Sequence, residues 1–375
     1  MTIFFNRPTI AGNELDYIQQ AVANAHTAGD GNFTRRCHAW LEARLGAPKA
    51  LLTHSCTAAL EMAALLFELG PGDEVIMPSF TFVSTANAVA LRGATPVFVD
   101  IRPDTLNLDE ELIEAAITPR TKAIFVVHYA GVGCAMDRIM DVAERHKLLV
   151  AEDAAQGLMS RFQGQPLGAI GHLGAISFHE TKNVISGEGG ALVINDDRFS
   201  GRAEIIREKG TNRSSFFRGE VEKYTWVDIG SSYLPSDIVA AFLFAQLEHA
   251  DRLLVERRNL WERYHVGLEP LERRGLCRRP IVPADCEHNA HLYYLLLPDP
   301  AARSALIAKL KSTGIEAPFH YVPLHDAPAG TRFARTSGIL RHTEDVARRL
   351  VRLPLWYGMT EEPNRVIDAV RTILE

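Results

Sequence analysis

The feature that most constrains the fold is a regular alternation of two hydrophobic patterns between residues 49 and 195. Short runs rich in Val, Ile, Leu and Phe, typical of strands, are separated by stretches with apolar residues at helical spacing, such as 57–69 and 136–146. Seven strands are predicted, at 49–53, 74–78, 95–100, 123–129, 148–153, 174–178 and 191–195. Strands that alternate with helices favour βαβ units, so we predict an α/β fold with a mostly parallel sheet in a three-layer domain.

The pattern changes after Pro235. Residues 236–268 form one long amphipathic run, which predicts a helix that bridges to a second unit. A predicted strand at 291–297 and a helix at 302–314 follow. We therefore expect a large domain over residues 1–250, with an N-terminal helical arm, and a smaller α+β domain over residues 251–375. A chain of 375 residues is long enough for both.

Composition argues against several classes of partner. The formal net charge of -6 and the pI near 6.2 provide no basic field for nucleic acid. The five cysteines are odd in number and form no C-x-x-C pair, so neither a disulfide framework nor a metal site is indicated, and a reducing compartment is expected. No basic segment leads into an apolar stretch, and 18 uninterrupted apolar residues occur nowhere. We expect a soluble cytoplasmic protein with no nucleic-acid or membrane partner.

Polar residues follow the carboxyl ends of several predicted strands. Ser55, Cys56 and Thr57 come between a strand and a helix, where free backbone amides and the helix dipole form an anion cradle. A simple helix cap is the alternative. Asp153 ends another strand, at the edge where open α/β sheets bind ligands, although a helix cap or turn also explains an aspartate there.

Lys182 follows the strand that ends at Ser177 and precedes glycines 187, 189 and 190. The glycines allow backbone to approach whatever Lys182 holds, but a loop lysine is also commonly solvated. Phe80 and Phe82 lie just past a strand end, either as core residues or, for one of them, stacked on a flat cofactor ring.

The combination points to pyridoxal phosphate. This cofactor needs a cradle for its phosphate, a carboxylate that keeps its ring nitrogen protonated, and a lysine that binds its aldehyde carbon. All three groups are predicted at one edge of one sheet, and each of them alone has an ordinary structural explanation. We therefore predict a pyridoxal phosphate enzyme.

Four motifs then resemble those of a known family. The segments "SCTAAL", "EDAAQG", "SFHETK" and "GEGG" are similar to the DegT/DnrJ/EryC1/StrS family of sugar-nucleotide aminotransferases, which have fold type I. The resemblance covers nearly the whole chain and implies that Lys182 binds the cofactor covalently and that Asp153 contacts its ring nitrogen. It also places Gln156 beside the ring, Phe82 as the stacking aromatic, and the phosphate at Cys56, Thr57 and Ser177.

Longer segments resemble a narrower group within this family. These are residues 207–237, "FTRRC" and "MPSFTFVSTANA". The resemblance implies transfer of an amino group from L-glutamate to C4 of dTDP-4-dehydro-6-deoxyglucose, in the synthesis of enterobacterial common antigen. It implies a homodimer with shared active sites, in which "GSSYLPSD" crosses to the partner. Many members carry Asn and a cation where this chain has Ser232 and Leu234, so Ser232 remains as the expected phosphate contact.

Substrate contacts are expected from two further segments. His320, Tyr321 and His325 lie in an aromatic stretch that either borders the sugar or is a packing turn, and Arg213 and Phe217 are expected near the nucleotide.

Three alternative functions compete with this prediction. Related dehydratases carry histidine in place of the lysine, so Lys182 argues against that reaction. Amination at another keto position is the second alternative, and a non-catalytic sugar-nucleotide-binding protein is the third.

Overall fold

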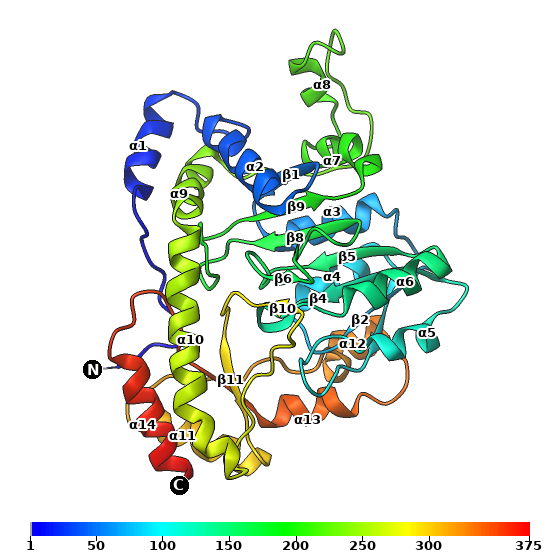
Figure 1. Ribbon diagram of the computed structural model, residues 1–375. Helices are drawn as coiled ribbons and strands as arrows, with labels where there is room; N and C mark the ends of the chain where they lie inside the picture. Colours follow the sequence, from blue (N-terminus) through cyan, green and yellow to red (C-terminus); the bar gives the residue numbers. More distant parts are fainter. Residues whose placement is uncertain (1) are drawn as a thin grey trace.

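A computed structural model describes residues 2–375, and its centre is an eight-stranded sheet (Figure 1). The strand order is β1-β9-β8-β5-β4-β2-β3-β12. β9 runs antiparallel to both of its neighbours, and every other pair is parallel. The strands are β1 Lys49–Thr53, β2 Glu74–Pro78, β3 Thr95–Val99, β4 Thr121–Val127, β5 Leu149–Asp153, β8 Leu173–Ser177, β9 Gly190–Ile194 and β12 Arg335–Thr336. The predicted α/β class and the seven predicted strands are confirmed.

Helices cover both faces of this sheet because its strands are apolar on both sides. On β1, Leu51 packs into the core that includes α3 (Cys56–Leu66), whereas Ala50 and Leu52 pack into the core that includes α2 (Asn32–Leu45) and α9 (Asp237–Glu248). The opposite directions follow from the two-residue period of a strand. The three predicted layers are therefore present.

The run at 236–268 is two helices rather than one. α9 ends at Glu248, His249 has non-helical angles (φ -105°, ψ 6°), and α10 spans Ala250–Arg273. The continuous helix expected from the hydrophobic pattern is wrong, because that pattern does not detect one non-helical residue between two helices. In Figure 1, α10 stands upright beside the sheet.

A second core surrounds the lower part of α10. It contains β11 (Tyr293–Leu296) paired antiparallel with β13 (Leu350–Leu353), and α11 (Pro300–Ser312) and α14 (Glu362–Leu374). Ile3 also belongs to this core and pairs with Ile315, so the N-terminal segment lies along the C-terminal third of the chain. The boundary at residue 250 stays a prediction.

The other elements complete the layers and the connections. They are α1 Glu14–Ala23, α4 Val83–Ala90, α5 Ile113–Ala116, α6 Met136–His146, α7 Ser200–Arg207, α8 Arg213–Phe217, α12 Pro328–Phe333, α13 Arg341–Arg349, β6 Arg161–Phe162, β7 Gln165–Pro166, β10 Cys286–Glu287, and the 3₁₀ turns η1 Glu110–Leu112, η2 Tyr129–Gly131, η3 Asp197–Phe199 and η4 Leu324–Asp326. α8 lies on an arm that projects away from the sheet (Figure 1).

A buried carboxylate fastens β12 to the sheet. Glu74 accepts hydrogen bonds from Arg335 (2.6 Å), Arg120 (2.6 Å) and Thr118 (2.8 Å). The Arg335 hydrogen bond is the main reason that the pKa of Glu74 falls to about 2. This ion pair holds the end of the segment that carries His320 and Tyr321.

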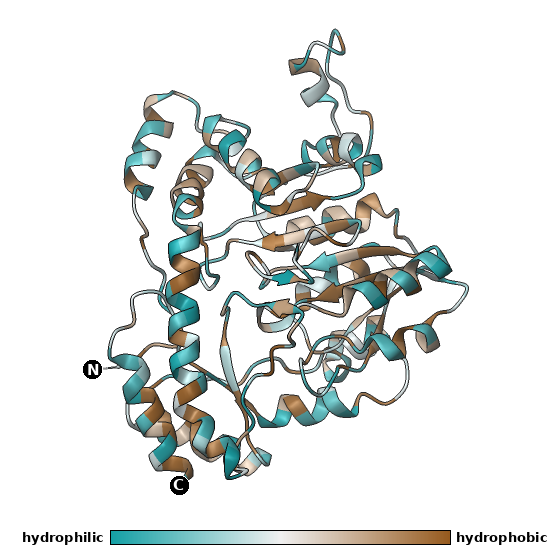
Figure 2. Ribbon diagram, in the orientation of Figure 1, coloured by the Kyte–Doolittle hydropathy of each residue, from teal (hydrophilic) through white to brown (hydrophobic). Residues whose placement is uncertain are grey.

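Hydropathy follows the layers. In Figure 2 the central strands are mainly brown, whereas the helices around them alternate brown and teal. Within residues 2–375, no helix combines the length and the apolar character that a bilayer span requires.

Candidate active site

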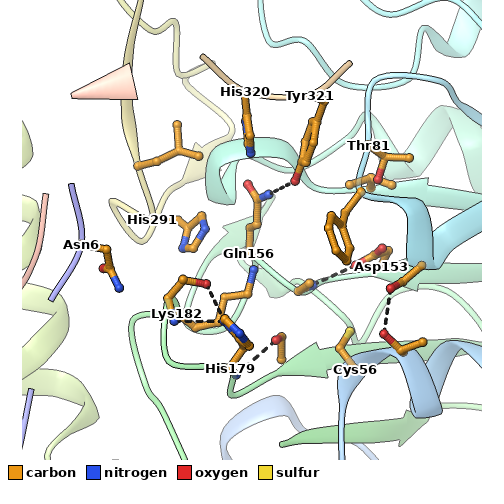
Figure 3. Close-up of a pocket in the computed structure, with 18 of the residues that line it drawn as sticks. Asn6, Cys56, Thr81, Asp153, Gln156, His179, Lys182, His291, His320 and Tyr321 are labelled. Atoms are coloured by element: carbon orange, nitrogen blue, oxygen red, sulfur yellow. Dashed lines mark hydrogen bonds between the residues drawn. The ribbon is translucent and has the colours of Figure 1, made fainter. Parts of the chain in front are cut away.

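A cavity of about 600 Å³ opens at the carboxyl ends of the parallel strands (Figure 3). Val127, Asp153 and Ser177, which end β4, β5 and β8, lie in its wall. Nine of the residues expected from the sequence line this one cavity: Cys56, Thr57, Phe82, Asp153, Gln156, Ser177, Lys182, His320 and Tyr321. They come together because parallel strands place their carboxyl ends at one edge of the sheet.

The start of α3 forms one end of the cavity. Ser55 caps the helix by accepting a hydrogen bond from the Ala58 amide (3.1 Å), so the capping interpretation holds for this serine. The amides of Cys56 and Thr57 lie in the first turn, where a helix offers no internal acceptor. They and the helix dipole leave the end of the cavity suited to an anion.

Gly190 explains how β9 approaches this helix start. A Cβ on Gly190 would lie 2.4 Å from the Cys56 nitrogen, so a larger residue would push β9 away from α3. The absence of a side chain at Gly190 therefore allows β9 to pack against the start of α3, rather than allowing a ligand to approach Lys182.

Asp153 is held rigidly at the end of β5. Its side chain accepts hydrogen bonds from Thr85 Oγ1 (2.7 Å) and from the Ala155 amide (3.1 Å), and the residue is 5% exposed. Burial raises the pKa of this carboxyl, and the two hydrogen bonds and Lys182 oppose that rise. A buried carboxylate in such a position requires a cationic partner. Thr85, on α4, is a residue that the sequence analysis missed.

Lys182 lies in the turn after β8, half-buried in the cavity wall (Figure 3). Its backbone amide donates to the His179 carbonyl (2.9 Å), which fixes the turn. Burial lowers the pKa of its amine, and the nearby Cys56 and Asp153 partly counter this effect. A lowered pKa increases the fraction of free amine, which is the form that acts as a nucleophile and as a base.

An aromatic network lines the opposite wall. Gln156 Nε2 donates to the Tyr321 hydroxyl (2.9 Å), and Gln156 Oε1 accepts from the Ala130 amide (2.7 Å). The Tyr321 ring stacks on His320 at 3.6 Å, and His320 Nδ1 is 2.8 Å from the Tyr129 hydroxyl. Burial lowers the pKa of His320, so its ring is neutral at physiological pH. This wall therefore offers flat surfaces and neutral hydrogen-bonding groups.

Phe80 and Phe82 differ in their exposure and in their surroundings. Phe80 is 1% exposed and packs on Tyr129 and Tyr321, as a core residue does. Phe82 is 58% exposed and borders the cavity, where its ring face is free for a flat ligand.

Four expected residues lie elsewhere. Ser232, Arg213 and Phe217 line a second cavity of about 860 Å³, beside the arm that carries α8. His325 is not part of the Lys182 cavity wall; its Nδ1 is 2.8 Å from Ser79 Oγ. The segment at 319–328 therefore has two roles. His320 and Tyr321 line the cavity, as expected for a substrate contact, whereas His325 contacts Ser79, as expected for a packing turn.

Arg352, on β13, also lines the cavity and was missed by the sequence analysis. Its Nε and Nη2 donate to the Phe319 carbonyl (3.2 and 2.9 Å), and its guanidinium lies 4.5 Å from the centre of the Phe5 ring. No motif marks an arginine that is 170 positions away from Lys182, so only the folded chain brings it to the site.

The arrangement fits pyridoxal phosphate. The cavity has an anion site at the start of α3, a buried carboxylate that lacks a cation, an exposed ring, and a lysine with a lowered pKa. These are the groups that bind its phosphate, its ring nitrogen, its ring face and its aldehyde.

Comparisons with known proteins agree with this geometry. Residues 8–371 match the model of the DegT/DnrJ/EryC1/StrS aminotransferase family. GDP-perosamine synthase of Caulobacter vibrioides is 34% identical over 98% of this chain and 97% of its own length. Spore coat polysaccharide biosynthesis protein SpsC of Bacillus subtilis is 33% identical over 99% and 97%. The PLP form of Spr1654 from Streptococcus pneumoniae superposes with a TM-score of 0.91 at 27% identity, covering 100% of this chain and 99% of that one.

Proposed function

The chain belongs to the DegT/DnrJ/EryC1/StrS family of pyridoxal-phosphate-dependent sugar aminotransferases, and on that premise we propose its substrates. The proposed reaction transfers the amino group of L-glutamate to C4 of dTDP-4-dehydro-6-deoxy-D-glucose. It gives dTDP-4-amino-4,6-dideoxy-D-galactose and 2-oxoglutarate. The observation that carries the chemistry is that Asp153, at the end of β5, and Lys182, in the turn after β8, line one cavity beside the start of α3. The choice of sugar is supported by the resemblance of residues 207–237.

Several residues are proposed to hold the cofactor. Its phosphate is assigned to the first-turn amides of Cys56 and Thr57 and to the Ser177 hydroxyl. Its ring is assigned to the face of Phe82, beside Gln156. When bound, pyridoxal phosphate supplies an aldehyde carbon that takes up the amine and a ring that accepts an electron pair.

Asp153 keeps the proton on the ring nitrogen in this proposal. Thr85 and the Ala155 amide orient its two oxygens, and its burial strengthens the attraction to a cation. The charge on Asp153 therefore sustains the electron-accepting state of the ring.

Lys182 carries the proton. In the first half of the reaction its free amine takes a proton from the α-carbon of the donor, and in the second half it delivers a proton to C4 of the sugar. Both steps require an amine that can take up and release a proton, and the burial of Lys182 lowers its pKa and so favours the neutral form that accepts one. The lysine also argues against the dehydratase alternative, in which histidine occupies this position.

A second substrate class is favoured by one comparison. GDP-perosamine synthase, at 34% identity, is named for a GDP-linked product. The same chemistry on a GDP-linked 4-keto-6-deoxy sugar is therefore the second candidate. Amination at a keto position other than C4 is the third.

We also propose a homodimer with shared sites. Ser232, Arg213 and Phe217 lie outside the Lys182 cavity of their own protomer, and Phe217 and Trp226 on the same arm are 70% and 77% exposed. A second copy would cover these rings and bring Ser232 to the cofactor phosphate of its partner.

The proposed setting is cytoplasmic synthesis of a cell-surface glycan, with enterobacterial common antigen and lipopolysaccharide as the expected products. The name of the spore coat polysaccharide relative supports a glycan pathway, and the five cysteines are free thiols, as a reducing compartment requires.

The substrate proposal is tested by incubating the holoenzyme with L-glutamate and either the dTDP-linked or the GDP-linked 4-keto-6-deoxy sugar. We expect amination of the dTDP sugar at C4, identified by NMR, with kcat/KM at least tenfold above that for the GDP sugar. Preference for the GDP sugar would transfer the assignment to the second candidate, and no amination of either would refute both.

A further inference from the structure

The Lys182 cavity contains one cationic side chain, Arg352, that is not among the residues proposed to bind the cofactor. Arg352 is the only arginine among the described residues that line this cavity, and it forms no ion pair with a described carboxylate. The neighbouring His291 and His320 cannot replace it as cations, because burial lowers the pKa of both rings. A partly buried guanidinium that lines a cavity and has no carboxylate partner among the described residues is suited to bind an anion from outside the chain.

The guanidinium is held in one orientation. Phe319 accepts from Nε and Nη2, and the Phe5 ring lies against the planar group. The group has five N–H donors, so three stay available, including both donors of Nη1. One Nη1 donor and the second Nη2 donor form a parallel pair that matches the two oxygens of a carboxylate.

We propose that Arg352 binds the α-carboxylate of the amino donor and so restricts donors to α-amino acids. This inference rests on the proposed function, because it assigns a subsite to that reaction. The carboxylate is attached to the carbon that loses its proton to Lys182. Its anchor must therefore lie close to the lysine amine.

Charge effects support that proximity. The positive charge of Arg352 contributes to the lowered pKa values of Lys182, His291 and His320. The other anion of the reaction, the diphosphate of the sugar nucleotide, is attached at C1, across the sugar ring from C4. When C4 is at Lys182, the diphosphate lies at least a ring width farther out, so an anchor near Lys182 suits the carboxylate better.

Calorimetry tests the inference on holoenzyme with 2-methyl-L-glutamate, which lacks the α-hydrogen and therefore binds without losing a proton. For Arg352→Gln we expect its Kd to rise roughly 10- to 150-fold, the effect of losing a hydrogen bond to a charged group. Arg348→Gln is the matched control, because this arginine is 67% exposed on α13 and its loss removes the same charge. Its Kd should stay at the wild-type value.

Kinetics separate the two anions. With Arg352→Gln, the first half-reaction with L-glutamate should slow, whereas the KM for the sugar nucleotide should stay within about twofold of the wild-type value. An unchanged Kd for 2-methyl-L-glutamate would overturn the inference. A rise in the sugar-nucleotide KM as large as the rise in donor Kd would also overturn it, because the arginine would then bind the diphosphate.

A conservative variant protects the test from misfolding. If Arg352→Gln loses its cofactor absorbance, Arg352→Lys is used, which keeps the charge but lacks the paired donors. We expect its donor Kd to rise roughly fivefold or more, and an unchanged value would again contradict the inference. Wild-type amination of the sugar nucleotide tests the proposed function separately, so the two failures are distinguishable.

Discussion

The two large cavities of this molecule differ in how their charges are partnered. The second cavity, near α8, is larger, at about 860 Å³ against about 600 Å³, but several of its cations are paired with its own acids. Arg213 is 3.0 Å from Glu208, and Arg218 and Lys49 are 2.9 and 2.5 Å from Glu204. In the smaller cavity Lys182 and Arg352 form no such pair within the described chain.

The difference teaches that charge without an ion-pair partner, rather than size, marks the site. In an ion pair, each charge is compensated within the protein. Lys182, Asp153 and Arg352 have no such partner among the described residues, so their charges are available to a bound ligand. The smaller cavity is also built on strand ends, which hold side chains rigidly, whereas the larger one lies beside a projecting arm. The predictions below test this contrast.

The largest effect is expected for Lys182→Ala. Removing the amine removes both the covalent attachment and the proton carrier, so steady-state amination should fall about 10⁴-fold or more while the protein stays folded. The control is Lys122→Ala, because Lys122 lines neither of the two cavities and is paired with Asp73 at 3.5 Å. We expect that variant to keep at least half of the wild-type rate. Substantial turnover by Lys182→Ala would be fatal to the assignment.

Asp153→Asn should have the next largest effect. The amide keeps the shape of the side chain but has no charge to hold a proton on the ring nitrogen, so kcat should drop roughly 100-fold or more. Thr85→Val, which removes the hydroxyl that orients Asp153, should cost less, about tenfold. The measurement is single-turnover kinetics with L-glutamate, and a near-normal rate for Asp153→Asn contradicts the role.

Hybrid dimers test whether the larger cavity acts across subunits. Ser232→Asp should be inactive because its negative charge repels the cofactor phosphate of the partner. When it is refolded with the inactive Lys182→Ala variant, random pairing should restore about a quarter of the wild-type activity, since each hybrid dimer has one intact site. If Ser232 serves its own protomer, the mixture stays inactive.

The smallest effect is a shift in one titration. In cofactor-free protein, Lys182 should lose its proton at a lower pH than an ordinary lysine, whose pKa is about 10.4, because burial disfavours its charged form. Reductive methylation with ¹³C-formaldehyde followed by NMR across pH measures this, with Lys182→Arg to assign the signal. A midpoint at or above the ordinary value would contradict the electrostatic description of the cavity.

The sequence was sufficient to predict the seven main strands of the sheet and the residues of the cavity wall that follow from their ends. Its seven main strands are short, mainly apolar runs, Asp153 and Ser177 end two strands that are adjacent in the sheet, and Lys182 lies in the turn after the second of them. Local pattern and strand direction therefore sufficed for these residues.

The remainder depends on contacts between distant parts of the chain. β12 has only two residues, Arg335 and Thr336, and joins the sheet through the ion pair with Glu74. Arg352 reaches the cavity through the pairing of β13 with β11 and is oriented by Phe5, from the N-terminus. Such partners leave no periodic signal in the sequence. In the proposed homodimer, the positions of Ser232 and Arg213 would also depend on the second chain.

Borohydride reduction of the holoenzyme tests the central claim most directly. The reagent fixes pyridoxal phosphate permanently to the lysine that holds it, and mass spectrometry of the digested protein identifies the peptide. Our account predicts the cofactor mass on Lys182, with no labelling of the Lys182→Ala variant at any other position. Labelling of a different lysine in the wild-type protein would contradict the account, because neither the proton transfer nor the pairing with Asp153 would then occur in this cavity.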